Sequence, residues 1–92
     1  PGYYKSNAYG IRIENLQTVI PVNAPLGGEK ELLGFEVLTL APMDLTLVDT
    51  SILSADEISW LNAYHAQVRA EIGPLVDDET RAWMETATQP IN

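Results

Sequence analysis

The sequence predicts an α+β fold, with a β-hairpin or small antiparallel sheet over about residues 9–48 and two helices over about 55–72 and 77–87. The first half is rich in β-branched residues and is interrupted by glycine and proline. The second half carries apolar residues at the three- and four-residue spacing of a helix. Strands followed by helices, rather than alternating with them, are typical of the α+β class.

The first expected strand covers residues 9–15. Side chains alternate between the two faces of a strand, so Arg12 and Glu14 share one face with Gly10. Tyr9 and Ile11 lie on the other face, which is apolar. The segment therefore predicts a strand with one polar and one apolar side.

A hairpin is expected next. Residues 16–22 form an apolar run, residues 23–34 hold the glycine and proline breakers of a loop, and residues 35–40 form a strand that Pro42 stops. Two strands around a glycine-rich loop predict an antiparallel hairpin. A shorter apolar run lies within residues 43–52. With only two helices to cover these strands, apolar strand faces or edges are expected to be exposed.

The long helix is expected to begin at Ser54, whose hydroxyl and the Glu57 carboxylate form the pattern of a capping box. Gly73-Pro74 ends it. A shorter helix follows from Asp77, with Trp83 and Ala87 on its buried face. The apolar stripe of the long helix consists of Ile58, Leu61, His65, Val68 and Ile72.

The composition excludes several classes of function. The chain carries 13 acidic and 5 basic residues, a net charge of −8, which disfavours nucleic acid and anionic membranes as partners. It has no cysteine, which excludes disulfides and thiolate metal sites. No apolar run approaches the ~20 residues of a membrane span. We expect a cytoplasmic protein.

Few side chains of the sequence suggest chemistry. Glu14, beside Arg12, is able to bind a hard or borderline cation through oxygen, but spacing alone favours a solvated strand face. A catalytic metal needs three or more protein ligands, and this segment offers one. His65, the single histidine, lies on the apolar stripe and is expected to be a packing residue. The aromatic residues Phe35, Trp60, Tyr64 and Trp83 are expected to be core or interface anchors rather than a ligand-stacking site.

Several segments resemble the Xaa-Pro aminopeptidases (aminopeptidase P), members of the pita-bread metallopeptidase family. Pro-Gly-Tyr-Tyr at residues 1–4 and Gly-Ile-Arg-Ile-Glu-Asn at residues 10–15 resemble the end of the catalytic domain. Residues 34–42 resemble the strand that follows the family's hairpin loop. The segments at 60–65 and 83–91 are similar to the C-terminal extension of the longer, three-domain enzymes.

The resemblance implies a parent enzyme that hydrolyses the N-terminal residue from peptides with proline in second position. Two divalent cations, typically manganese, activate the attacking water in this chemistry. Glu14 matches the glutamate that bridges the two ions, and Arg12 matches an arginine that lies behind that ligand or on the substrate side. The family's other glutamate ligand precedes the position of Pro1, and its two aspartates and histidine lie further upstream. The 92 residues alone are therefore expected to be inactive and to bind no metal tightly.

The resemblance also implies an organisation and leaves alternatives open. Residues 1–42 correspond to the end of the catalytic domain and residues 43–92 to the helical extension, which together form effectively one small structural unit. The alternative is a stand-alone interaction or dimerisation module without catalysis, in which the helices make homodimer contacts. A catalytically dead homologue is a third interpretation.

Overall fold

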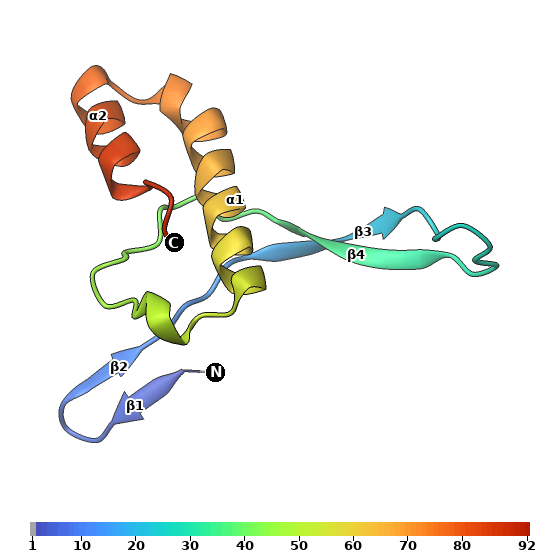
Figure 1. Cartoon of the computed structure of the whole chain (residues 1–92), viewed down its shortest axis with the longest axis horizontal. Coiled ribbons are helices and arrows are strands. Elements are labelled where there is room, and N and C mark those ends of the chain that lie inside the picture. Colours follow the sequence, from blue (N-terminus) through green and yellow to red (C-terminus); the bar gives the residue numbers. More distant parts are fainter. Residues whose placement is uncertain (1) are drawn as a thin grey trace. The chain divides into compact units, whose positions relative to one another are not determined.

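The structure is a computed structural model and describes residues 2–92, so the predicted motif residue Pro1 lies outside the described part. The chain divides into two compact units, one ending at Thr39 and the other covering Leu40–Asn92. The first unit holds all four strands and the second both α-helices (Figure 1). The predicted order of strands and then helices is confirmed. The assignment of residues 1–42 to a catalytic domain and 43–92 to an extension remains a prediction.

The first hairpin pairs β1 (Tyr3–Lys5) with β2 (Tyr9–Ile11) in antiparallel fashion. Its turn contains Asn7, at a φ of 56°, a left-handed conformation that asparagine tolerates well. The strand expected over residues 9–15 is therefore too long, because it ends at Ile11. The ladder described consists of three residue pairs, from Tyr3 opposite Ile11 to Lys5 opposite Tyr9.

The second hairpin pairs β3 (Gln17–Val22) with β4 (Leu32–Val37), as predicted, but β4 begins and ends three residues before the expected 35–40. Gly34 lies inside β4 rather than in the loop. A Cβ at this position would stand 2.7 Å from Cγ1 of Val22. Glycine at position 34 thus allows a close cross-strand contact.

Residues 43–52 form no further strand. They form turns and the 3₁₀ helix η1 (Thr50–Ile52).

The second hairpin has an exposed apolar face. Val19 lies opposite Phe35, and Pro21 lies opposite Leu33. The exposed fractions are 56% for Val19, 71% for Phe35 and 72% for Leu33. The expectation of exposed apolar strand residues is therefore confirmed, and a two-stranded hairpin of this kind gains little stability by itself.

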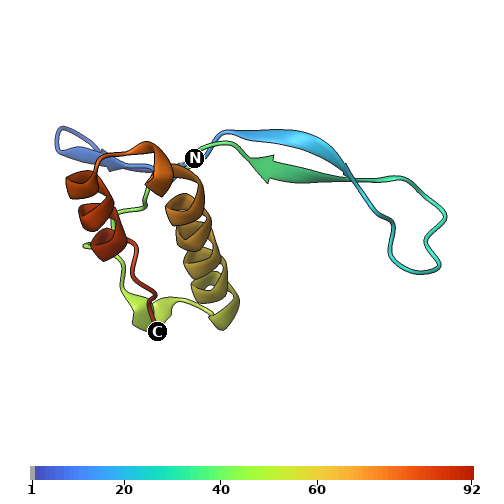
Figure 2. The ribbon, with the colours of Figure 1, turned by 90° about the horizontal axis from the view of Figure 1, so that it is seen from above.

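The second unit is built on α1 (Ala55–Ile72), which turns through the 3₁₀ helix η2 (Gly73–Leu75) into α2 (Asp78–Ala87). The two α-helices lie side by side and run in opposite directions (Figure 2). The predicted capping box is present: the Ser54 hydroxyl accepts from the Glu57 N–H at 3.2 Å, and the Glu57 carboxylate accepts from the Ser54 N–H at 2.8 Å. The core consists of Leu61, Tyr64, His65, Val68, Met84 and Thr88.

Polar side chains of α1 hold the segment that follows α2. The Asn62 amide donates to the Ile91 carbonyl and accepts from the Ile91 N–H, both at 2.9 Å. Arg69 donates to the carbonyl and hydroxyl oxygens of Thr88. The residues after α2 are thereby fixed along α1. Within residues 2–92, neither helix is both long and apolar enough to cross a membrane.

Candidate functional site

The register of the first hairpin brings the candidate residues of the sequence together with an unexpected tyrosine. Tyr4 lies directly opposite Gly10, and Arg12 follows Gly10 by two residues. Directly opposed residues of an antiparallel pair point to the same face. We call Tyr4, Gly10, Arg12 and Glu14 the Arg12 cluster.

Gly10 makes room for the Tyr4 ring. A Cβ at Gly10 would stand 2.8 Å from Cδ1 and 3.0 Å from Cε1 of Tyr4, closer than real contacts allow. The absence of a side chain therefore lets the aromatic ring lie directly across the neighbouring strand.

Arg12 connects the other members of the cluster. Its Nε donates a hydrogen bond to the Tyr4 hydroxyl oxygen, and its guanidinium carbon lies 5.5 Å from the centroid of the Tyr4 ring. The same Nε lies 3.8 Å from Oε1 of Glu14. The side chain of Arg12 is 62% exposed and that of Glu14 is 51% exposed. Tyr4 thus holds the arginine by a hydrogen bond and a cation–π contact, and the arginine approaches the carboxylate.

The cluster offers one group suited to a metal ion. A carboxylate is a good ligand for a divalent cation such as Mg²⁺ or Mn²⁺, and it is also suited to bridging two of them. A catalytic site needs at least three protein ligands. Residues 2–92 contain no group of three or more His, Asp or Glu side chains that could hold a metal ion. The described residues therefore fit a contribution of one ligand to a metal centre, and they do not complete one.

The sequence predicted the pairing of Arg12 with Glu14 and missed Tyr4. The two-residue spacing of Arg12 and Glu14 is a local signal. Tyr4 comes close to Arg12 only because β1 pairs with β2 in this register. The signal that could have revealed it was a short turn at residues 6–8 between two tyrosine-containing runs.

His65 is far from these residues in the sequence and belongs to the second unit. It is buried, with 1% exposure, and its Nε2 accepts a hydrogen bond of 3.0 Å from the Met43 N–H. Burial and the positive charge of Arg69 lower the pKa of His65 below its ordinary value. The structure agrees with a packing role for this histidine.

Of the aromatic residues expected to be core or interface anchors, Tyr64 lies in the core, and whether the other three are interface anchors stays a prediction. Tyr64 is buried, and its ring is stacked on Trp60 at a centroid distance of 5.4 Å. Trp60 is 50% exposed, Trp83 60% and Phe35 71%. The prediction that Trp83 lies on a buried face is wrong, because Met84 is the residue of α2 that packs into the core.

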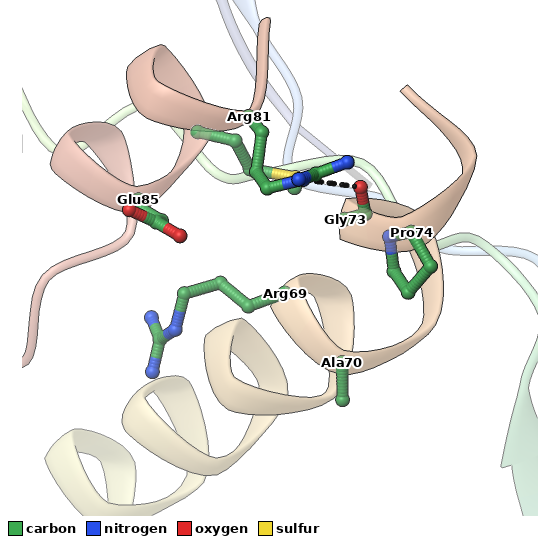
Figure 3. Close-up of a pocket in the computed structure, with 7 residues that line it drawn as sticks. Arg69, Ala70, Gly73, Pro74, Arg81 and Glu85 are labelled. Carbon is green, nitrogen blue, oxygen red and sulfur yellow. Dashed lines mark hydrogen bonds between the residues drawn. The ribbon is translucent and has the colours of Figure 1, made fainter. Parts of the chain in front are cut away.

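A pocket of about 530 Å³ lies between α1 and α2 (Figure 3). Its charged side chains are Arg69, Arg81 and Glu85. The Arg81 Nε donates to the Gly73 carbonyl at 2.9 Å, and its Nη2 lies 3.3 Å from the Val76 carbonyl oxygen. These bonds satisfy carbonyls at the C-terminal end of α1 and in the connection that follows, so Arg81 stabilises the turn between the helices.

Comparison with known proteins agrees with the resemblance in the sequence. A family model described as the C-terminal region of peptidase M24 matches residues 31–91. A probable Xaa-Pro aminopeptidase P of Coprinopsis cinerea is 43% identical, and aminopeptidase P2 of Arabidopsis thaliana is 45% identical. Each match covers 99% of this chain, and the chain spans 15% and 13% of the two relatives.

A solved structure shares the fold. The crystal structure of X-prolyl aminopeptidase from Caenorhabditis elegans, described as a cytosolic enzyme with a di-nuclear active site, matches with a TM-score of 0.87 and 37% identity. The match covers 99% of this chain and 15% of that chain. The chain therefore belongs to the peptidase M24 family, whose C-terminal region it contains, and it is homologous to aminopeptidases P.

Proposed function

We propose that this chain forms the C-terminal part of an Xaa-Pro aminopeptidase, which removes the N-terminal residue from peptides with proline in second position. The observation that carries the proposal is the match of 99% of the chain, at 37% identity, to an X-prolyl aminopeptidase with a di-nuclear active site. The name of the Coprinopsis relative, a probable Xaa-Pro aminopeptidase P, supports the same substrate class.

In this proposal Glu14 would supply one carboxylate ligand to two divalent cations. Its side chain is half-exposed and lies three residues beyond the end of β2, so its oxygens are accessible to metal ions held by other parts of the enzyme. The two ions, expected to be manganese, would activate the attacking water and polarise the scissile carbonyl. The 92 residues alone supply one ligand, and we expect them to be inactive.

Arg12 would position Glu14 or contact the substrate. Its approach to within 3.8 Å of the carboxylate supports the first role, and its 62% exposure leaves room for the second. Tyr4 would act as a positioning residue, because its hydroxyl and ring both contact the guanidinium group.

A chimeric enzyme tests the activity. In it, this chain replaces the matched region of the Caenorhabditis elegans enzyme, which is the region whose fold it shares. We expect manganese-dependent release of the first residue from an Xaa-Pro peptide and no release from the matched Xaa-Ala peptide. A folded chimera that loads metal but does not distinguish the two peptides would contradict the proposal.

A second candidate is an interaction or dimerisation module without catalysis. The exposed side chains of Trp60, Trp83 and Phe35 favour it, because large aromatic residues are enriched at interfaces. Sedimentation of the 92-residue chain tests this candidate, since a homodimer should appear and should dissociate on dilution. A monomer at all concentrations would exclude the dimerisation module and leave the enzyme as the remaining candidate.

A cytoplasmic location is supported by the description of the nematode relative as cytosolic.

A further inference from the structure

The hydrogen bond at His65 depends on the protonation state of the ring. Nε2 accepts from the Met43 N–H at 3.0 Å, and a ring nitrogen accepts only when it carries no proton. In the neutral ring the proton is therefore on Nδ1. This atom is buried and has no hydrogen-bond partner among residues 2–92. The ring is held by one bond, and that bond requires the neutral form.

The neighbouring tyrosine holds the same segment by a bond that does not titrate in mild acid. The Tyr64 hydroxyl donates to the Ala41 carbonyl at 2.6 Å. Helix α1 therefore holds residues 41–43 at two points, through a donor on Tyr64 and an acceptor on His65. Only the second point is sensitive to protons near neutral pH.

Among residues 2–92, no acidic side chain forms an ion pair with the His65 ring. The charge that acts on the ring is that of Arg69, one turn further along α1. Asp44 follows Met43 in the segment that is bonded to His65, but its carboxylate accepts from the Thr46 N–H at 2.9 Å. From α2, Arg81 and Glu85 line the inter-helix pocket together with Arg69. A buried imidazolium would thus lie beside a cation without a partner of its own.

We propose that His65 is an acid-sensitive latch, in which protonation of Nε2 turns the acceptor into a donor facing the Met43 N–H and frees Met43 from α1. The proton comes from solvent, and the bond that breaks is the hydrogen bond from Met43. Ala41 stays bound to Tyr64, so the opening is local. The inference is independent of the proposed catalysis, because it involves only residues of the second unit, Leu40–Asn92.

The sign of the pH dependence follows from the direction of the pKa shift. Burial lowers the pKa of His65, so the unfolded or opened state binds the proton more tightly. The latch is fully closed above the ordinary histidine pKa of about 6.5 and opens as the pH falls through the lowered value. The pKa values of Asp44, Asp49, Glu57 and Asp77 are all held below their ordinary values by hydrogen bonds, so these carboxylates stay ionised in that interval.

Hydrogen exchange of the 92-residue chain, followed by NMR as the pH is lowered, tests the latch. The protection factor of the Met43 amide should fall by about tenfold over the same interval in which the His65 ring titrates. The Ile91 amide is the internal control, because it donates to Asn62 at 2.9 Å and this side chain does not titrate. Its protection factor should stay constant.

The variant His65→Gln supplies a matched control, because an amide oxygen can accept from Met43 without titrating. Its Met43 amide should remain protected across the interval. The proposal is overturned if Met43 stays protected while the ring titrates, or if Ile91 loses protection together with Met43. It is also overturned if His65→Gln retains the pH dependence. Should this variant fail to fold, the comparison of Met43 with Ile91 in the unsubstituted chain still decides the question.

Discussion

The hydroxyl of Tyr4 accepts a hydrogen bond from Nε of Arg12, while the Tyr4 ring lies beneath the same guanidinium group at 5.5 Å. One aromatic side chain thus fixes the arginine at two points. The arginine in turn lies 3.8 Å from the Glu14 carboxylate. A perturbation of Tyr4 should therefore reach Glu14 through Arg12.

Tyr4→Phe removes the hydrogen-bond acceptor and keeps the ring. In the chimeric enzyme we expect kcat/KM for an Xaa-Pro peptide to fall by roughly tenfold, near the lower end of the range for a hydrogen bond to a charged group, because this bond is exposed. Tyr3→Phe is the matched control, because Tyr3 is equally exposed, at 59%, and lies opposite Ile11 rather than Gly10. Equal effects of the two substitutions would exclude a positioning role for Tyr4.

Gly10→Ala tests the same contact by steric means. The new Cβ would stand 2.8 Å from the Tyr4 ring, so the ring must move away from the Arg12 cluster. We expect a loss of kcat/KM at least as large as that for Tyr4→Phe. Gly73→Ala is the control, because its Cβ would meet only Cε of Met84, at an ordinary 3.5 Å. Unchanged kinetics in Gly10→Ala would show that the position of Tyr4 is unimportant.

Arg81→Ala should destabilise the helical unit. It leaves the carbonyl of the buried Gly73 and that of Val76 without their donor, which costs about 1–3 kcal/mol of the free energy of unfolding. Urea denaturation of the chain measures this loss. The control is Asp78→Asn, which removes the exposed ion pair with Arg81 and one negative charge from the first turn of α2, and it should cost clearly less than Arg81→Ala. Similar midpoints for both variants would contradict the assigned role of Arg81.

The capping box predicts a pH dependence of α1. Hydrogen bonds from Ser54 lower the pKa of Glu57, so this contribution to stability is present above the ordinary glutamate pKa and is lost as the pH falls through the lowered value. Ser54→Ala keeps the backbone N–H that is the larger cause and removes the hydroxyl that is the smaller one, so the pKa of Glu57 should rise part of the way towards its ordinary value, as measured by NMR titration. Thr86→Ala provides the comparison, since its hydroxyl bonds only to the Ala82 carbonyl within α2. A Glu57 pKa that is identical in Ser54→Ala and the unsubstituted chain would contradict the assignment.

Helix α1 could be predicted nearly to the residue because its signals are local. Ser54 and Glu57 mark its start, and Gly73-Pro74 marks its end. The strands were predicted less well, since their limits depend on a partner. β2 ends at Ile11, which pairs with Tyr3, and Gly34 lies within β4, where Val22 packs close across it.

The candidate site divides in the same way. The spacing of Arg12 and Glu14 is a property of the local sequence and was enough to pair them. Arg12 and Tyr4 are eight residues apart along the chain, and their contact depends on the hairpin register, so only the turn at residues 6–8 could have indicated it. The exposure of Trp83 was missed for a related reason, because a helical pattern indicates that a face is apolar but does not indicate which neighbour covers it.

The metal content of the chimeric enzyme tests the central claim most directly, namely that Glu14 is a ligand of the di-nuclear site. Elemental analysis after dialysis should give two manganese ions per unsubstituted chain and fewer than two for Glu14→Gln. Glu36→Gln is the matched control, because Glu36 is an exposed carboxylate on β4 outside the Arg12 cluster, and it should retain both ions. If Glu14→Gln binds two manganese ions as tightly as Glu36→Gln does, Glu14 is not a metal ligand and the account is contradicted.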